Sequence, residues 1–454
     1  MAYERIKAAL QSAADTEQVL IGAGVLSSVE DVFRQSFGEQ PAQVVADENT
    51  FRVAGEQVRR ELASAGRRVA EPYVFPGRPI LYADYGNVEL LRDTLRGQPG
   101  IAVAVGSGSL NDIVKRASFE CDRRYMAVAT AASMDGYTAF GAAITRGGYK
   151  QTMTCPAPRA VLADLDLLRT APPEMTASGY ADLLGKVTAG ADWIIADSLG
   201  VEMINQPVWS MVQDPLREAI GRPAELQAGD QAAMDSLIEG LIMSGLAMQS
   251  AASSRPASGA EHQFSHLWEM EGLGHDSQPP LSHGFKVGLG SIAIAALYER
   301  ILSRDLQHLD IPALCRAWPT ADELERSVRA AHQTPGLTEA AVKESLAKYV
   351  GADELAVRLD LLQERWPELR ERLEAHLLTA DQLRQMLLAA GCPVHPSEVG
   401  LRLEAFRETY YRARMIRRRY TLLDLATETG VLAQCVDELF ARGGFWTRGP
   451  AAQV

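Results

Sequence analysis

Histidines gather in one short part of this sequence. Four of the eight histidines lie between positions 262 and 283, and His262 and His266 stand four residues apart. A helix would place these two imidazoles on the same face. Two imidazoles and a carboxylate that leave one coordination position open form the ligand set of a catalytic zinc ion or a related divalent metal. Asp182, in the upstream segment GYADLLGK, is a candidate carboxylate, and His283 begins the downstream segment HGFKVGLG.

HxxxH pairs also occur by chance on helix surfaces and in helix cores, so the pair alone leaves a structural alternative open. His275 lies in the glycine-rich stretch GLGHDSQPP, and we interpret it as a loop residue.

A second candidate site is the segment IAVAVGSGSLNDIVKRAS, which begins at Ile101. An apolar strand runs into Gly106-Ser107-Gly108-Ser109, and a helix follows. Backbone N–H groups at a helix N-terminus, approached through glycines, can bind a pyrophosphate. The alternative is a turn that needs glycine only for positive φ angles.

Two further segments follow predicted strands. In VVADENTF, Asp47 ends an early strand, where an acidic residue can hydrogen-bond an adenosine ribose and favour NAD over NADP. The alternative is that Asp47 caps the next helix. In TAASMDGYT, which begins at Thr130, small hydroxyl residues suit a loop that lines a cleft, although Asp-Gly is also an ordinary turn.

The elements that would position these residues change in kind along the chain. Short apolar runs alternate with helical patterns in the first third, which indicates βαβ units and a parallel sheet. We expect strands at Gln43–Ala46, Tyr73–Phe75, Ile101–Val105, Met126–Ala129 and Ala160–Ala163, with helices at Glu56–Ala65 and Asn87–Leu95.

Beyond about Thr170 only helical patterns remain. We expect helices at Ala177–Asp197, Gln231–Ala251, Phe285–Arg304, Leu337–Val350, Asp353–Leu373 and Thr379–Ala390, with Asp182 at the start of its helix. Two prolines near residue 172 favour a boundary there. The sequence thus predicts an α/β nucleotide-binding domain at residues 1–171 and an all-helical metal- and substrate-binding domain at 172–454, extended by further helices at its C-terminal end.

The composition of the chain indicates which classes of binding partner are unfavourable. The net charge of −13 disfavours nucleic acid and anionic membranes, because phosphate contacts need a basic face. The five cysteines show no CxxC spacing, and neither a signal peptide nor a membrane span is indicated. A cytoplasmic enzyme that acts on a small molecule fits these features best.

Taken in order, the glycine-rich loop, the GxxD segment, HxxxH and HG-x-x-V resemble the superfamily of dehydroquinate synthases, glycerol dehydrogenases and iron-type alcohol dehydrogenases. Within it, the sn-glycerol-1-phosphate dehydrogenase family, in its bacterial branch, is the most similar over roughly Gln18 to Arg304. The segments that carry this likeness are VVADENTFRVAG, TAASMDGYTAFGAAI, APRAVLADLDLL, DLLGKVTAGADW and SGAEHQFSHLWEM.

The resemblance implies a Rossmann-like domain followed by an all-α, dehydroquinate-synthase-like domain. It implies metal ligation by Asp182, His262 and His283, and substrate contacts from Asp135, Asp182 and His266, with His266 and Asp135 as the catalytic residues. It also implies NAD contacts, in addition to Asp47, from Gly106, Ser107, Gly108, Ser109, Leu110, Thr130, Ala131, Ala132 and Ser133.

Two positions depart from the family pattern. Ala139 stands where the family usually has a serine, so a cofactor contact from a hydroxyl there would need Thr138 instead. Ser107 stands where the family commonly has a glycine, which restricts the backbone of the loop.

The reaction implied is reduction of dihydroxyacetone phosphate to sn-glycerol 1-phosphate. The cofactor would be NAD, with NADP as an alternative, and the metal zinc, with nickel as an alternative. His266 or a relayed water would protonate the alkoxide. A glycerol or polyol dehydrogenase and a dehydroquinate-synthase-like cyclase remain alternatives. Arg255, Lys150 and Lys286 are candidate phosphate contacts, Arg255 first, and we expect a homodimer.

Overall fold

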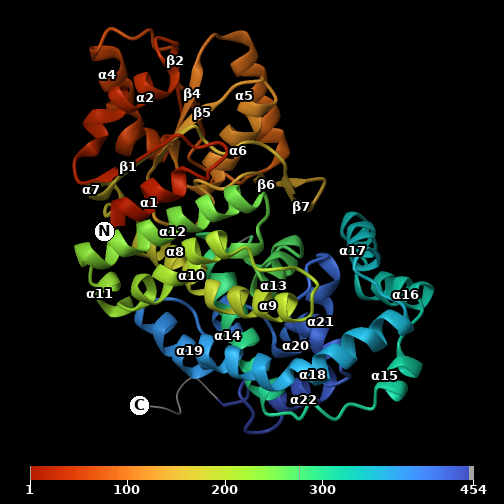
Figure 1. Cartoon of the computed structure of the whole chain (residues 1–454). Coiled ribbons are helices and arrows are strands. Elements are labelled where there is room, and N and C mark those ends of the chain that lie inside the picture. Colours follow the sequence, from red (N-terminus) through yellow and green to blue (C-terminus); the bar gives the residue numbers. More distant parts are fainter. Residues whose placement is uncertain (1, 276, 449–454) are drawn as a thin grey trace. The chain divides into compact units, whose positions relative to one another are not determined.

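The computed structural model describes residues 2–275 and 277–448, which form two compact units (Figure 1). The first unit is Met1–Leu183 with Pro207–Ser254, and the second is Leu184–Gln206 with Arg255–Val454. The predicted division at residue 171 follows the change from strands to helices, which the structure has after Asp164. As a division of function, that boundary stays a prediction.

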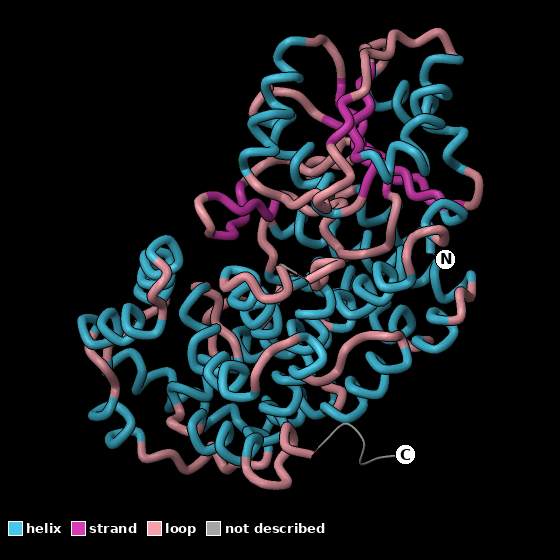
Figure 2. The backbone as a smooth tube through the Cα atoms, turned by 180° about the vertical axis from the view of Figure 1, so that it is seen from behind, coloured by secondary structure: helices cyan, strands magenta, loops and turns pink. Residues whose placement is uncertain are grey.

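The first unit contains a six-stranded parallel sheet with strand order β1-β8-β5-β4-β2-β3. β4, β5 and β8 are buried along their whole length, because both faces of a parallel sheet are covered by helices. The strands are β1 Gln18–Gly22, β2 Ala42–Asp47, β3 Tyr73–Phe75, β4 Ile101–Gly106, β5 Tyr125–Ala129 and β8 Ala160–Asp164. An antiparallel hairpin of β6 (Ala142–Arg146) and β7 (Tyr149–Met153) stands apart from this sheet (Figure 2).

Helices cover the two faces of the sheet, α2 and α4 on one side and α5 and α6 on the other (Figure 1). Val29 and Phe33 of α2 and Val58 of α4 join the strand residues Val44 and Val103 in a buried cluster. The helices of this unit are α1 Ala2–Leu10, α2 Val29–Phe37, α3 Glu48–Thr50, α4 Glu56–Ser64, α5 Tyr85–Gly97, α6 Gly108–Phe119, α7 Leu165–Leu168, α8 Pro173–Leu184, α10 Gln206–Ile220, α11 Pro223–Gln227 and α12 Gln231–Ala251.

The order of the strands reverses between β2 and β4. β3 lies outside β2, whereas β5, β8 and β1 follow β4 in the opposite direction. Ligands of open α/β sheets bind beyond the carboxyl ends of the strands at such a switch point. Asp47 ends β2 and Gly106 ends β4, so both predicted cofactor segments leave the sheet at this point.

The second unit contains helices joined by loops and no strand among its described residues. Its helices are α9 Lys186–Ser198, α13 Ala260–Met270, α14 His283–Leu302, α15 Ile311–Ala317, α16 Ala321–Ala331, α17 Pro335–Ala347, α18 Ala352–His376, α19 Ala380–Ala389, α20 Leu403–Arg412, α21 Leu422–Glu428 and α22 Leu432–Phe440. α13 packs along α14. Phe264 and Trp268 of α13 join Phe406 and Tyr410 in an aromatic cluster with ring centroids 5.0 to 6.4 Å apart.

The predicted fold class is confirmed: all five expected strands are present, and no strand follows β8 among the described residues. β1 and the β6–β7 hairpin were not predicted. The expected helix Ala177–Asp197 is two helices, α8 and α9, that meet at Gly185. Asp182 therefore lies near the end of α8 and not at a helix start, because the helix already begins at Pro173, where the first turn tolerates proline. No helix among the described residues is long and apolar enough to cross a membrane.

Candidate functional site

The turn between β4 and α6 has the form expected of a pyrophosphate-binding loop. Neither Gly106 nor Gly108 has a positive φ, so the explanation that these glycines serve only an unusual turn is wrong. Space is the reason for glycine: a Cβ on Gly106 would overlap Leu110, and one on Gly108 would lie 2.8 Å from Cε of Met134. Ser107 is the N-cap of α6 but makes no side-chain cap hydrogen bond. The first N–H groups of α6 are therefore not capped by this side chain and point to where an anion could bind.

Asp47 has the structural role that the sequence left open. Its carboxylate accepts hydrogen bonds from the N–H groups of Asn49 and Thr50 at 2.8 and 3.1 Å and from the Thr50 hydroxyl at 3.1 Å. These contacts form a capping box at the start of α3. These capping contacts hold the half-buried carboxylate of Asp47 in a fixed position at the end of β2. The hydrogen bond from Asp47 to a ribose stays a prediction.

The loop after β5 packs tightly against α8. The Ser178 hydroxyl donates to the carbonyl oxygen of Ser133 at 3.1 Å, and a Cβ on Gly179 would overlap the carbonyl oxygen of Ala132. Tyr137 stabilises the loop with a hydrogen bond from its hydroxyl to the carbonyl oxygen of Ala131 at 2.9 Å. The predicted cofactor residues Thr130–Ser133 are therefore held by backbone contacts at the carboxyl end of β5.

Asp135 and Asp182 are brought together within the first unit. The Asp135 N–H donates to Oδ2 of Asp182 at 3.1 Å, and the Ser244 hydroxyl donates to Oδ2 of Asp135 at 2.8 Å. Asp182 is fully buried. Ser244, on α12, was missed by the sequence analysis, since no motif surrounds it. Thr138 cannot stand in for the missing serine, because it is fully buried and donates to the carbonyl oxygen of Ile242 at 2.9 Å.

Lys115 was also missed, and it orders the chain after Asp135. Its ammonium donates to the carbonyl oxygens of Gly136, Ala139 and Gly141 at 3.2, 2.9 and 2.9 Å. Burial raises the pKa of the nearby Asp112 carboxyl, while the Lys115 charge opposes that rise. A lysine within the apolar stretch of α6 was the available signal.

The three predicted site histidines form a cluster inside the second unit. His262 and His266 lie on α13, and His283 is the first residue of α14, where Ser282 caps the helix by accepting from the Phe285 N–H. The ring centroids are 5.8 Å apart for His262 and His266, 5.4 Å for His262 and His283, and 5.8 Å for His266 and His283. HxxxH thus belongs to a real histidine cluster. His275 lies outside both helices, as predicted.

Each of these imidazoles contacts a charged group through Nδ1. Nδ1 of His262 lies 2.7 Å from Oε1 of Glu261, and Nδ1 of His283 lies 2.8 Å from Oε1 of Glu269. Nδ1 of His266 lies 3.4 Å from the guanidinium of Arg417. Burial, followed by the Arg417 charge, lowers the pKa of His266 well below its usual value. His266 is therefore a neutral imidazole near neutral pH.

Buried carboxylates support the start of α13. Burial alone would raise the pKa of Glu261, but the hydrogen bond and charge of His262 and the N–H of Gly259 lower it. Asp192 accepts from the Ala260 N–H at 2.7 Å and from the Tyr298 hydroxyl at 2.7 Å. Burial and the neighbouring Glu261 raise the pKa of Asp192 to about 7.

These donors suit a divalent metal. Imidazole nitrogens next to carboxylates match zinc and similar ions, and His266, Glu269 and His283 offer one ligand atom each within 4.8 Å of one another. Of the metal ligands predicted in the second unit, His283 belongs to this group, and the ring centroid of His262 lies 5.4 Å from that of His283. Asp182, the third predicted ligand, belongs to the first unit.

Arg255 was the wrong first choice for phosphate recognition. Its side chain is 1% exposed and donates to the carbonyl oxygens of Tyr420 and Asp192 at 2.9 and 3.0 Å, with Glu202 3.3 Å away. It therefore holds segments of the second unit together. Lys286 lies on α14 one turn after His283 and is 7% exposed.

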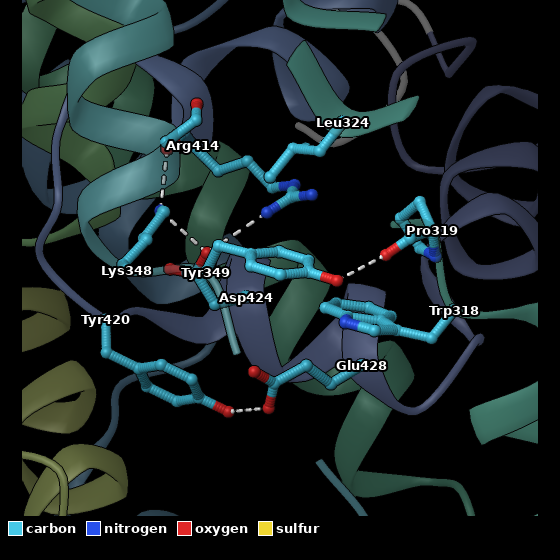
Figure 3. A pocket seen from close by; sticks show the side chains of 10 residues that line it. Trp318, Pro319, Leu324, Lys348, Tyr349, Arg414, Tyr420, Asp424 and Glu428 are labelled. Atoms are coloured by element: carbon cyan, nitrogen blue, oxygen red, sulfur yellow. Dashed lines mark hydrogen bonds and ion pairs between the residues drawn. The ribbon is translucent and has the colours of Figure 1, made fainter. Parts of the chain in front are cut away.

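A separate pocket of the second unit is lined by paired charges (Figure 3). Lys348 contacts Asp424 at 2.7 Å, and the Tyr420 hydroxyl donates to Glu428 at 2.5 Å. Burial lowers the pKa of Lys348, while Asp424 opposes that change. Because these groups satisfy one another, we assign this pocket a structural role.

Comparison with known proteins finds relatives in sequence and in fold. The model of the family described as iron-containing alcohol dehydrogenase matches residues 20–172. The glycerol-1-phosphate dehydrogenase (NAD(P)+) of Halalkalibacterium halodurans is 38% identical over 257 residues, which are 56% of this chain and 64% of that protein, slightly less than two thirds of its length. The protein of the same name from Bacillus velezensis is 34% identical over 295 residues, 64% of this chain and 74% of that protein.

The fold is shared more widely. The solved structure of a probable glycerol dehydrogenase from Sinorhizobium meliloti aligns with a TM-score of 0.60 and 14% identity, covering 93% of this chain and 97% of that chain. The sequence relatives show the family of this chain, whereas the solved structure, at 14% identity, shows only the fold. The chain belongs to the glycerol-1-phosphate dehydrogenase family, among the oxidoreductases related to iron-containing alcohol dehydrogenases.

Proposed function

We propose that this chain is a metal-dependent NAD(P) oxidoreductase that reduces dihydroxyacetone phosphate to sn-glycerol 1-phosphate. The observation that carries the proposal is the cluster of His262, His266 and His283, with charged groups at Nδ1, in a chain whose relatives are named glycerol-1-phosphate dehydrogenases.

NAD(P) would bind at the switch point of the sheet. The N–H groups at the start of α6, from Gly108 to Leu110, would hold the pyrophosphate, with Gly106 and Ser107 forming the approach. Asp47 would hydrogen-bond the adenosine ribose, which favours NAD. The loop Thr130–Ser133 would line the nicotinamide side, and its backbone contacts to α8 support a fixed position.

The metal would be held by Asp182, His262 and His283. Two imidazoles and a carboxylate are a ligand set for zinc, and nickel remains the alternative. When bound, the metal would polarise the ketone oxygen as a Lewis acid, and the nicotinamide would supply the hydride.

The remaining roles belong to the side chains around the substrate. His266, as a neutral imidazole, would donate an N–H hydrogen bond to the alkoxide oxygen, and a water would supply the proton. Asp135, fixed by Ser244 and by the carboxylate of Asp182, would bind a substrate hydroxyl. Lys286 replaces Arg255 as the candidate phosphate contact, because Arg255 is committed to carbonyl oxygens.

The test is oxidation of NADH and NADPH by the purified chain with dihydroxyacetone phosphate and with dihydroxyacetone. We expect kcat/KM to be higher for the phosphorylated ketone by about 100-fold or more, since a site built for phosphate leaves polar groups unpaired without it. In the reverse direction, sn-glycerol 1-phosphate should be oxidised and sn-glycerol 3-phosphate should not. Equal rates with both ketones would indicate a polyol dehydrogenase, and no net change in NADH would indicate a cyclase.

A further inference from the structure

The three clustered histidines differ in the sign of the charge at Nδ1. His262 and His283 each have a glutamate oxygen within 2.8 Å of Nδ1, whereas His266 has an arginine nitrogen at 3.4 Å. The ring centroids of the three imidazoles lie within 5.8 Å of one another, so the three rings share one environment. The difference in charge at Nδ1 therefore comes from the residue that each Nδ1 contacts.

The charge of the group at Nδ1 determines which tautomer each histidine adopts. A carboxylate oxygen accepts hydrogen bonds, so Nδ1 of His262 and of His283 is assigned the proton, and Nε2 is the nitrogen with the lone pair. A guanidinium only donates, so Nδ1 of His266 must accept, and Nε2 carries the proton. A metal binds a nitrogen lone pair, and a hydrogen-bond donor to the reacting oxygen needs an N–H.

The glutamates are built to hold their rings. Glu261 is fully buried and also accepts from the Gly259 N–H at 2.6 Å and the Thr188 hydroxyl at 2.9 Å. These contacts, together with that of His262, keep its oxygens in place. The Glu269 side chain is 5% exposed. The Ser265 hydroxyl oxygen lies 3.2 Å from Nδ1 of His283 and can accept from the same N–H.

We propose that Glu261 and Glu269 are positioning residues that fix His262 and His283 as Nδ1–H tautomers, with Nε2 as the metal ligand, while Arg417 fixes His266 as the opposite tautomer, an Nε2–H donor. The assignment of metal and substrate rests on the proposed function. The tautomers themselves follow from the contacts within the second unit.

The direct test is NMR of the full chain with ¹⁵N-labelled histidine, before and after zinc is added. Substitution of one histidine at a time assigns the signals. We expect His262 and His283 to be Nδ1–H tautomers whose Nε2 signals shift on zinc addition, and His266 to be an Nε2–H tautomer. An Nε2–H tautomer at His283 or an Nδ1–H tautomer at His266 in the metal-free chain would overturn the proposal.

Zinc affinity, measured by competition with a chelator, tests the positioning role. Glu269→Gln should weaken zinc binding about 10- to 100-fold, as is usual for partners of metal-bound histidines, and Glu269→Asp should restore part of it. Glu271→Gln is the matched control, because Glu271 follows the same helix and pairs with Arg412, not with a histidine. A Glu269→Gln chain that binds zinc like the control would contradict the proposal.

Arg417→Met tests the proposed role of Arg417 in fixing the tautomer of His266. Zinc affinity should stay within about twofold, while kcat falls about tenfold or more without a matching rise in KM, because only the N–H hydrogen bond to the reacting oxygen is disturbed. Arg417→Lys keeps a donor and should rescue part of kcat. A loss of zinc affinity in Arg417→Met equal to that in Glu269→Gln would contradict this division. If the tautomers are as expected but zinc supports no ketone reduction, the proposed function fails and the tautomer assignment stands.

Discussion

The backbone N–H of Asp135 donates a hydrogen bond to the carboxylate of Asp182 at 3.1 Å. This contact ties the loop after β5 to the end of α8. Ser244 holds the Asp135 side chain from α12 at 2.8 Å. A proposed metal ligand and a proposed substrate contact are therefore held by one hydrogen-bond network within the first unit.

Asp182→Asn should separate the structural from the metal-binding role of this carboxylate. The amide oxygen can still accept from the Asp135 N–H, so thermal stability should change little, but the loss of charge should weaken zinc binding and lower kcat by about 100-fold. Zinc content and turnover of the same preparation check this. Ser244→Ala is the control, with normal zinc content and kcat/KM lower by about tenfold. Full zinc content in Asp182→Asn would remove Asp182 from the ligand set.

Gly179→Ala should destabilise the chain and weaken cofactor binding. The added Cβ overlaps the Ala132 carbonyl oxygen, so the loop of cofactor residues must shift, at a cost of about 1–3 kcal/mol in the free energy of unfolding. Gly97→Ala, at the exposed end of α5 with no atom within 4 Å of the new Cβ, should be neutral or stabilising. Denaturant unfolding and the Kd for NADH measure both effects. Equal stability of the two variants would show that the loop adapts without strain.

Asp47→Ser should change cofactor preference without loss of the helix cap. Serine also caps helices, so stability should be nearly unchanged, whereas Asp47→Ala should cost about 1 kcal/mol. Without the carboxylate, a 2′-phosphate no longer meets a negative charge, and the ratio of kcat/KM for NADPH to that for NADH should rise about tenfold. An unchanged ratio in Asp47→Ser would leave Asp47 with its capping role alone.

Stability should fall in mild acid because of His332. This residue is fully buried near Arg412, and burial followed by the Arg412 charge lowers its pKa to about 4. Between pH 6.5 and about 4, His332 binds a proton in the unfolded chain but not in the folded chain, which favours unfolding. The contribution of neutral His332 to the free energy of unfolding is therefore complete above pH 6.5 and is lost as the pH falls towards 4.

His332→Leu removes this titration. Its free energy of unfolding should depend less on pH in this window, by about 2 kcal/mol relative to the unchanged chain. His308→Leu, at a histidine side chain that is 81% exposed, is the control and should keep the original pH dependence. Parallel pH profiles for all three chains would place the acid lability elsewhere.

Much of the fold could be predicted because buried parallel strands read as apolar runs. IAVAVG and YMAVA are buried along their whole length and were predicted almost to the residue. β1 was missed because QVLIG is a short edge strand that is only partly buried. The division of the chain into discontinuous units depends on packing between distant helices, which periodicity does not record.

The site residues found from the sequence were those in compact motifs, such as HxxxH. The partners of these histidines were out of reach, because Arg417 is 151 positions from His266 and nothing near it marks it. Arg255 shows the opposite error: closeness to the histidine motif in sequence suggested phosphate binding, whereas its side chain is buried against backbone carbonyls.

Zinc add-back to the chelated chain, with NADH oxidation by dihydroxyacetone phosphate followed at each step, tests whether the proposed reaction depends on a metal. We expect activity to disappear on chelation and to return in proportion to zinc bound, up to one ion per chain, with His262→Asn neither binding zinc tightly nor recovering. Full activity in the chelated chain, or zinc binding without recovery of ketone reduction, would contradict the proposed metal-dependent reaction.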